Sequence, residues 1–255
     1  MIPLSRPSIG PEEAEAAVRV IRSGWLAQGE EVAALETEFG RYLDADDPPH
    51  VVAVSSGTAA LHLALLASGV DHCTTVTCPS YTFVATANAA LYCGAHVSLR
   101  EIDPVTFNLD PACIQSRFDR VIIAVHQVGL PADIDAMRAR LPQARIVEDA
   151  ACAIGARYLD GKRVGTRGDT IACFSLHGSK SVVAGEGGLV VTRDPDTADR
   201  VRRMRQHGVD IGAEHRSNNA EAESYVELGF NYRMTDVQAA IARVQIRKAD
   251  DIVDR

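Results

Sequence analysis

Seven short apolar runs rich in β-branched residues recur along this chain, and helical patterns separate most of them. For example, VIIAVHQ (121–127) precedes the helical pattern ADIDAMRARL (132–141), which in turn precedes RIVED (145–149). Strands that alternate with helices form mostly parallel sheets covered on both faces. The sequence therefore predicts an α/β fold with a mostly parallel seven-stranded sheet sandwiched by helices. The other expected strands are 51–56, 75–79, 96–102, 171–176 and 188–193, and further helices are expected at 58–68 and 82–94.

The two ends of the chain depart from this alternation. The N-terminal segment contains two amphipathic patterns separated by SGWLAQG (23–29), and the C-terminal segment is helical up to its last residue. We expect three parts: an N-terminal helical segment (1–45), a large α/β domain (46–240), and the start of a helix (241–255) that leads to a further part beyond Arg255.

The charge balance and the apolar pattern exclude several classes of protein. Lys and Arg number 26 against 34 Asp and Glu, a net charge of -8, whereas a nucleic-acid-binding surface normally shows a basic excess. No apolar run approaches the roughly 20 residues that cross a bilayer, and the N-terminus lacks a signal-peptide pattern. The six cysteines form no C-x-x-C motif. We expect a cytoplasmic protein without nucleic-acid, membrane or metal binding.

Two of the predicted strands end in residues that suit a ligand. Gly57 and Thr58 lie in the sequence SSGT between a strand and a helix, where free backbone N–H groups and the helix dipole favour a phosphate. A plain helix cap is the alternative. Asp149 ends RIVED at the carboxyl edge of the sheet, where a solvent-exposed acid is the alternative.

A lysine follows another predicted strand in a loop rich in glycine and serine. Lys180 comes five residues after Ser175, in SLHGSK, and precedes GEGG (185–188). Burial would make such a lysine a candidate nucleophile, although most loop lysines are surface residues. The GEGG sequence lacks the G-x-G-x-x-G spacing and precedes a strand, so it does not indicate a nucleotide-binding loop.

Together these features match the requirements of pyridoxal 5′-phosphate. That cofactor needs a phosphate site, an acid beside its ring nitrogen, a flat partner for its ring and a lysine. The phosphate turn, Asp149, Ser175 and Lys180 follow in that order along the chain. Phe83 is the candidate for stacking on the ring, with a core aromatic as the alternative.

The same motifs resemble the DegT/DnrJ/EryC1/StrS family of nucleotide-sugar aminotransferases along nearly the whole chain. The resemblance implies the fold type I architecture of pyridoxal-phosphate enzymes, in homodimers with shared active sites. The matching blocks are 23–29, 55–65, 78–97, 102–111, 125–137, 148–156, 164–192, 205–208 and 229–241.

The resemblance assigns a role to each candidate residue. Lys180 matches the lysine that holds the cofactor as a Schiff base, and Asp149 matches the acid that pairs with the pyridine nitrogen. Phe83 matches the stacking aromatic. The residues that match phosphate contacts are Gly57, Thr58, Ser175 and, toward the neighbouring subunit's cofactor, Asn231.

The family's activity implies transfer of an amino group from a donor, usually glutamate, to a nucleotide-linked keto-sugar. 2-Oxoglutarate would leave, and the aminated sugar would serve cell-surface polysaccharides or secondary metabolites. The freed Lys180 amine would act as general base and acid. The sugar cannot be identified from the sequence; Tyr232, Arg233 and His126 are candidates for contacting a nucleotide diphosphate, or structural residues.

The chain departs from the family pattern in two respects. Cys152 stands where most members carry glutamine, and a thiol is a weak hydrogen-bond donor. Members typically continue into a small C-terminal domain that closes over the substrate. This chain would therefore lack that lid, and a cofactor-binding protein with little activity is one alternative.

Two other functions compete with transamination. A sugar 3-dehydratase uses the same cofactor but has histidine in place of the lysine; Lys180 is present, and His177 comes too early to replace it. A sensory or regulatory role is the other, and the intact set of cofactor residues argues against it.

Overall fold

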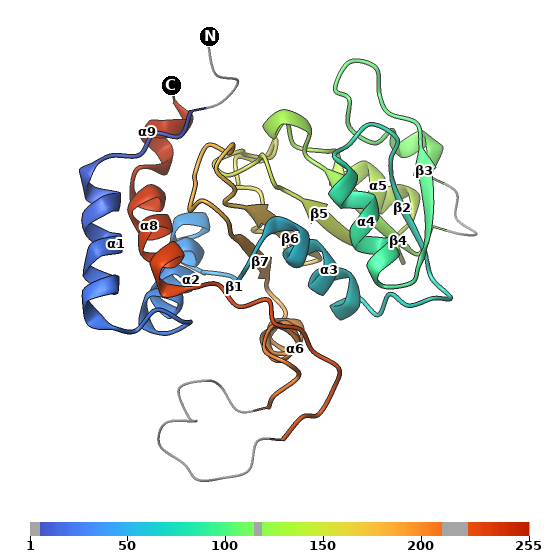
Figure 1. Ribbon diagram of the computed structural model, residues 1–255. Coiled ribbons are helices and arrows are strands. Elements are labelled where there is room, and N and C mark those ends of the chain that lie inside the picture. The colour runs from blue at the N-terminus through green and yellow to red at the C-terminus, as the bar shows by residue number, and fades with distance from the viewer. Residues whose placement is uncertain (1–5, 115–118, 211–223, 255) are drawn as a thin grey trace.

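The computed structural model describes residues 6–114, 119–210 and 224–254, so the outermost residues of the two predicted end segments lie outside the described part. A seven-stranded sheet in the order β1-β7-β6-β5-β4-β2-β3 forms its centre (Figure 1). Neighbours from β6 to β3 pair in parallel, whereas β7 is antiparallel to both β6 and β1. The predicted mostly parallel, seven-stranded sheet is confirmed. The strands are β1 (His50–Val54), β2 (Thr75–Pro79), β3 (His96–Arg100), β4 (Val121–Val125), β5 (Arg145–Asp149), β6 (Thr170–Ser175) and β7 (Gly188–Thr192).

Helices cover both faces of this sheet because its strands bury alternate side chains on opposite sides. In β4, Ile122 and Ala124 pack into one hydrophobic cluster, whereas Val121 and Ile123 pack into the other. The first cluster includes side chains of α2 (Glu30–Leu43), α5 (Ile134–Arg140) and α8 (Asp236–Arg247). The second includes side chains of α3 (Gly57–Ala67), α4 (Val84–Tyr92) and α6 (Pro195–Arg205).

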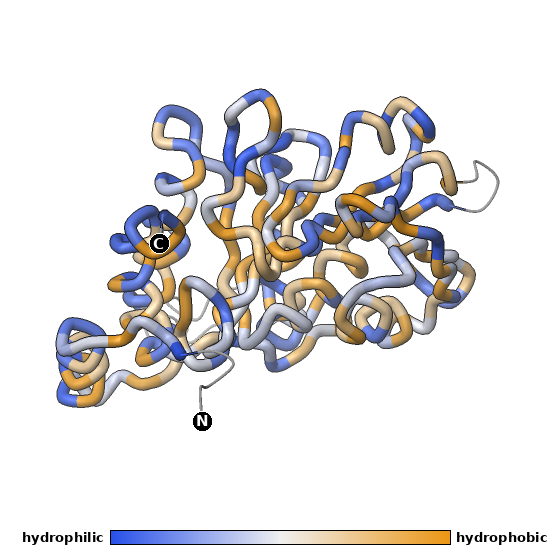
Figure 2. Tube along the Cα trace, turned by 90° about the horizontal axis from the view of Figure 1, so that it is seen from above, coloured by the Kyte–Doolittle hydropathy of each residue, from blue (hydrophilic) through white to orange (hydrophobic). Residues whose placement is uncertain are grey.

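The N-terminal and C-terminal helices pack against each other. α8 lies between α1 (Pro11–Ser23) and α2, and the short helix α9 (Ala249–Val253) follows it (Figure 1). α1 and the C-terminal helices alternate hydrophobic and hydrophilic colour around their turns (Figure 2), as amphipathic helices do. α8 runs without a break across residue 240, where the sequence predicts a boundary. The division of the chain at residues 45 and 240 stays a prediction.

One buried carboxylate joins α8 to α2. Asp236, at the beginning of α8, accepts hydrogen bonds from the backbone N–H groups of Gly29, Glu31 and Val32 at 2.8, 3.3 and 3.1 Å. These N–H groups lie at the beginning of α2. Backbone N–H groups at that end of a helix have no acceptor within their own helix. The carboxylate therefore caps α2 from a residue more than 200 positions away in the sequence.

Several predicted elements run past their observed ends because the chain turns into the candidate site there. β4 ends at Val125 and is followed by the 3₁₀ turn η2 (Gln127–Gly129), in which Val128 has a φ of 51°. Likewise, α4 begins at Val84, because Phe83 has an extended backbone. A second 3₁₀ turn, η1 (Pro111–Cys113), precedes β4.

In the described part of the chain, no helix is both long enough and apolar enough to span a membrane. The same residues contain no group of three or more His, Cys, Asp or Glu side chains placed to hold a metal ion.

Candidate active site

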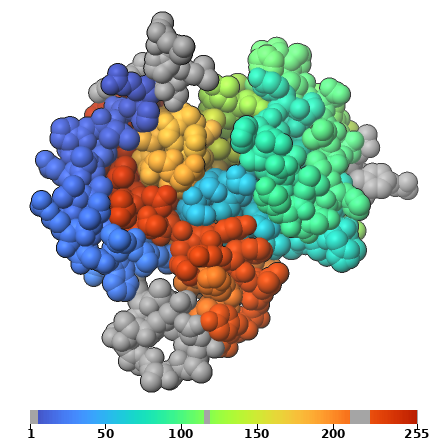
Figure 3. All heavy atoms as spheres, viewed as in Figure 1, coloured from blue at the N-terminus to red at the C-terminus, as the bar shows by residue number. Residues whose placement is uncertain are grey.

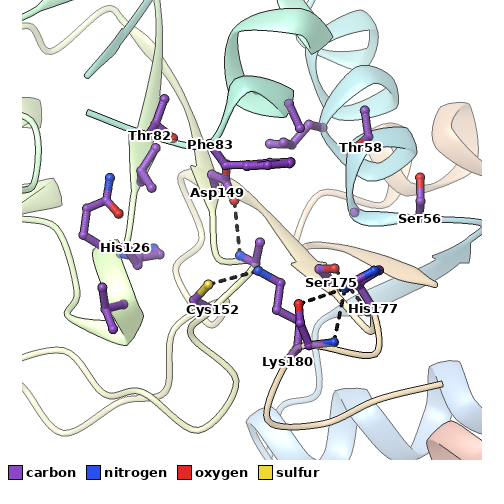
Figure 4. Close-up of a pocket in the computed structure, with 18 of the residues that line it drawn as sticks. Ser56, Thr58, Thr82, Phe83, His126, Asp149, Cys152, Ser175, His177 and Lys180 are labelled. Atoms are coloured by element: carbon purple, nitrogen blue, oxygen red, sulfur yellow. Dashed lines mark hydrogen bonds between the residues drawn. The ribbon is translucent and has the colours of Figure 1, made fainter. Parts of the chain in front are cut away.

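A cavity of about 500 Å³ opens beside the carboxyl ends of β1, β2, β4, β5 and β6 (Figure 4). This edge of a parallel sheet is where ligands bind in open α/β folds. Six of the seven residues predicted as site residues line the cavity, namely Gly57, Thr58, Phe83, Asp149, Ser175 and Lys180. The seventh, Asn231, does not.

The turn between β1 and α3 forms one wall of the cavity. Ser56 caps α3 by accepting the N–H of Ala59 at 3.1 Å, so the helix-cap interpretation is correct for this serine. The backbone N–H groups of Gly57 and Thr58 lie in the first turn of α3 and have no acceptor within the helix. They are therefore able to donate hydrogen bonds to a ligand. Only glycine fits at position 57, because an added Cβ would lie 2.8 Å from the Cβ of Ser175. The close approach brings the helix N-terminus and the Ser175 hydroxyl together.

Asp149 is held in place at the end of β5 and is only 6% exposed, which excludes the solvent-exposed alternative. Its carboxylate accepts a hydrogen bond from the hydroxyl of Thr86 at 2.7 Å and from the N–H of Ala151 at 3.2 Å. Thr82 in turn contacts the Thr86 hydroxyl at 2.8 Å. The carboxylate therefore presents a fixed negative group at the cavity wall.

Lys180 is half-buried and extends into the cavity, where its Nζ lies 3.1 Å from the Sγ of Cys152 (Figure 4). Its own loop is ordered by local bonds: the Lys180 N–H donates to the carbonyl of His177, and the His177 ring contacts the Ser179 hydroxyl at 2.8 Å. Lys180 is therefore not a surface-loop lysine. The contact with Cys152 was not predicted, because nothing in the sequence relates residues 28 positions apart.

Phe83 lines the cavity from the residue before α4 and is 77% exposed. The core-aromatic alternative is wrong. An exposed ring on the wall of a cavity is available for stacking on a flat ligand, although that role stays a prediction.

A buried polar network that the sequence did not reveal lies behind this wall. Glu148 points to the opposite face from Asp149 and is fully buried. It accepts hydrogen bonds from Tyr158, from Thr170 and, at 2.8 Å, from Nε2 of His126. Burial raises the pKa of the Glu148 carboxyl, but these hydrogen bonds outweigh that effect and hold its pKa below the ordinary value.

The same network fixes the state of His126. Its Nδ1 accepts the N–H of Ala132 at 2.9 Å, so the proton lies on Nε2 and is donated to Glu148. Neither ring nitrogen is free to bind a nucleotide diphosphate. The bonds instead fix the beginning of the loop 126–131, which contains the cavity residues Gln127 and Val128.

The segment 224–235 passes beside α3, outside the cavity (Figure 3). In it, Asn231 is exposed and forms a backbone bridge with Gln206. Tyr232 stacks on Phe230 with ring centroids 5.0 Å apart and contacts His62 at 3.2 Å. These contacts give Tyr232 a structural role. An exposed Asn231 is compatible with a contact to another subunit, which stays a prediction.

The charged side chains that line the cavity are Lys180, Asp149 and Glu186, together with the imidazole of His177. Glu186 Oε1 lies 3.7 Å from Nε2 of His177, and both side chains are exposed. No arginine lines the cavity within the described part of the chain.

A scan against protein-family models matches residues 7–255 to the DegT/DnrJ/EryC1/StrS aminotransferase family. The chain belongs to this family. The predicted resemblance and the fold that it implies are thereby confirmed, since the matching structures below share the same α/β sheet.

Solved structures of family proteins superpose closely on the chain. DesV of S. venezuelae, in complex with a ketimine intermediate, is 36% identical, with a TM-score of 0.83 over 94% of this chain and 62% of DesV. The sugar aminotransferase CalS13 of Micromonospora echinospora is 31% identical, with a TM-score of 0.87 over 98% of this chain and 69% of CalS13. The 3-amino-5-hydroxybenzoic acid synthase is 33% identical, with a TM-score of 0.87 over 98% of this chain and 64% of the synthase. The chain thus spans about two thirds of the length of these proteins.

Proposed function

We propose that this chain acts in a pyridoxal-phosphate-dependent transamination, with glutamate as amino donor and a nucleotide-linked keto-sugar as acceptor. The observation that carries the proposal is the convergence of the Lys180 amine and the Asp149 carboxylate on one cavity, which the helix N-terminus at Gly57 also lines. The similarity of the chain to the sugar aminotransferase CalS13 supports a sugar as the acceptor.

The residues of the cavity fit the cofactor. The Gly57 backbone lies against Ser175 with no space for a side chain, which leaves N–H groups and a hydroxyl for a phosphate. Asp149 would hold a proton on the ring nitrogen, and its bonds from Thr86 and Ala151 fix its direction. The exposed ring of Phe83 is available to cover one face of the pyridine.

When bound, pyridoxal phosphate supplies an electron sink for the negative charge left by proton removal. The amine of Lys180 would anchor the cofactor and, once released, carry the proton between carbon atoms of the reacting pair. Such a base must reach both atoms, and a lysine with four methylene groups at the cavity wall has that reach. The aromatic and apolar lining around it, from Phe83, Leu61 and Val125, would limit the access of water.

The charge of the cavity supports a shared site. Glutamate and a nucleotide diphosphate are anions, yet the described lining provides Lys180 and no arginine. Additional cationic groups would come from a second copy in a homodimer, toward which the exposed Asn231 would also point. We place this reaction in the cytoplasm, in the synthesis of sugars for cell-surface polysaccharides or secondary metabolites.

Titration with pyridoxal phosphate tests the cofactor site. We expect a visible absorbance band that borohydride bleaches, with a phosphopyridoxyl mass found by peptide mapping on Lys180. Lys180→Ala should lose both the band and the mass, whereas Lys162→Ala, an exposed lysine in another loop, should keep them. A labelled residue other than Lys180, or an unlabelled protein, would refute the assignment.

The substrate is tested by incubating the loaded chain with glutamate and a panel of keto-sugar nucleotides, with 2-oxoglutarate and amino-sugar as the measured products. Formation of 2-oxoglutarate in proportion to amino-sugar supports the proposal. Deoxygenation of the sugar with release of ammonia would indicate the dehydratase instead.

A further inference from the structure

The contact between Cys152 and Lys180 brings two reactive side chains together at the wall of the candidate active site. The Sγ and Nζ atoms are 3.1 Å apart, and both residues line the same cavity of about 500 Å³. Cys152 is exposed, so a small molecule in the cavity can reach its sulfur (Figure 4).

Most of the other cysteines are poorly suited to oxidation. The thiolate is the reactive form of cysteine, and burial disfavours it. Burial raises the pKa of Cys78 and of Cys93 to about 11, and it raises the pKa of Cys173 well above the ordinary value. Burial, together with the neighbouring Asp110 carboxylate, also raises the pKa of Cys113.

We propose that Cys152 and Lys180 form an oxidant-responsive pair. A hydroperoxide converts Cys152 to a sulfenic acid, and the Lys180 amine condenses with it to a sulfenamide that withholds the lysine from the cofactor. The effect on the cofactor rests on the function proposed above, whereas the cross-link itself depends only on the two side chains.

The two steps balance with the hydroperoxide as the only oxidant. In the first, the Cys152 sulfur attacks one peroxide oxygen, so that an S–O bond forms and the O–O bond breaks. The sulfur loses two electrons, which reduce the other oxygen to water or an alcohol. In the second, the unprotonated Nζ of Lys180 attacks the sulfur, an S–N bond forms, and the S–O bond breaks with release of water. A sulfenic acid condenses with a backbone nitrogen to a sulfenamide by the same exchange, and here the Lys180 amine takes the place of the backbone nitrogen.

The pair returns to its starting state with thiols. An added thiol attacks the sulfur of the sulfenamide and releases the Lys180 amine. A second thiol then reduces the mixed disulfide to free Cys152, so two added thiols are oxidised for each pair restored.

The state of Lys180 decides whether the cross-link can form. When the lysine is bonded to pyridoxal phosphate, its amine is not available to the sulfur. The cofactor-free chain therefore forms the cross-link, and the loaded chain resists it in proportion to its occupancy.

The test treats the full chain, stripped of cofactor, with hydrogen peroxide and follows its intact mass and its peptide map. We expect the loss of the mass of two hydrogen atoms, a joined peptide containing residues 152 and 180, and recovery of the original mass with dithiothreitol. Preloading with pyridoxal phosphate should slow the loss. Peroxide that yields only higher sulfur oxides at Cys152, or a cross-link that forms equally fast in the loaded chain, would overturn the proposal.

Three variants separate the cross-link from other oxidations. Cys152→Ser should abolish the joined peptide. Cys73→Ser should keep it, because Cys73 is also exposed but has no lysine partner within the described residues. Lys180→Arg should leave a sulfenic acid at Cys152 that dimedone captures. If the joined peptide forms but the chain never binds pyridoxal phosphate, the proposed function fails while the cross-link stands.

Discussion

Glu13 provides a quantitative test of how α1 is attached to the rest of the molecule. Its side chain is 1% exposed and accepts hydrogen bonds from the Gly10 N–H at 2.8 Å, from Gln245 at 2.8 Å and from Lys248 at 2.9 Å. Burial raises the pKa of the Glu13 carboxyl, but the bonds from Lys248, Gln245 and Gly10 outweigh this and lower its pKa from 4.5 to about 2. The carboxylate thus links the beginning of α1 to α8 and the residue that follows it.

The shift sets the size and the pH window of the effect. A pKa lowered from 4.5 to about 2 corresponds to about 3 kcal/mol of stability, at about 1.36 kcal/mol per unit. Because the folded state holds the proton more weakly, this stability is fully present above pH 4.5 and is lost as the pH falls toward 2. At about pH 3, roughly 1.4 kcal/mol of it remains.

Urea unfolding of the wild type and of Glu13→Gln, measured from about pH 7 to pH 3, checks this prediction. The difference in unfolding free energy between the two should fall from about 3 to roughly 1.4 kcal/mol over that range. Glu12→Gln is the matched control, because Glu12 contacts the same Lys248 at 2.8 Å but is 68% exposed. A difference for Glu13→Gln that does not change with pH would refute the reasoning.

The structure makes three further predictions. Gly57→Ala should weaken binding of pyridoxal phosphate by about tenfold or more in a titration, because the new Cβ would lie 2.8 Å from that of Ser175 and force α3 away. Tyr158→Phe should lower the unfolding free energy by about 2 kcal/mol in urea, since it removes a buried donor to Glu148. Asp236→Ala should cost about 1 to 2 kcal/mol in the same assay, because three N–H groups at the start of α2 lose their acceptor.

Matched variants control each of these predictions. Gly168→Ala adds a Cβ whose nearest neighbour is the Arg193 side chain at 3.9 Å, so it should leave cofactor binding unchanged. Tyr42→Phe removes a hydroxyl that bonds the exposed Asp250, and should cost less than Tyr158→Phe. Asp46→Ala, on an exposed turn, should have little effect compared with Asp236→Ala. If the control variant of a pair lost as much cofactor binding or unfolding free energy as its test variant, the role given to the contact in that test variant would be wrong.

The sheet was predictable because its strands other than the edge strand β3 are largely buried on both faces and so appear as continuous apolar runs. The direction of β7 was not. Its sequence GLVVT has the same apolar character as the parallel strands, and all of its residues are buried. What sets its direction is the connection from β6, whose twelve residues contain no helix to carry the chain back across the sheet.

The candidate site was predictable where the chemistry follows a strand directly, as for Asp149 and for the Ser175 to Lys180 spacing. It was not predictable where distant residues meet. His126 gave no sign that both of its ring nitrogens are engaged, since one partner is Glu148 and the other is the backbone of Ala132. Phe83 was ambiguous for a different reason, because a single aromatic residue has no pattern that distinguishes a core position from a cavity wall.

The place of β1 at the edge of the sheet determines when the cavity can be completed. β7 is its only strand neighbour in the part of the chain that the structure describes, and β7 is the last of the described strands to emerge during synthesis. The turn at Gly57 lies against Ser175, which also belongs to a late strand. A nascent chain therefore holds β1 unpaired until β7 has been made, since long-range pairing must wait for both partners. The turn at Gly57 is consequently completed only after β6 and β7 have been made, and the apolar strand His50–Val54 is open to aggregation before that point.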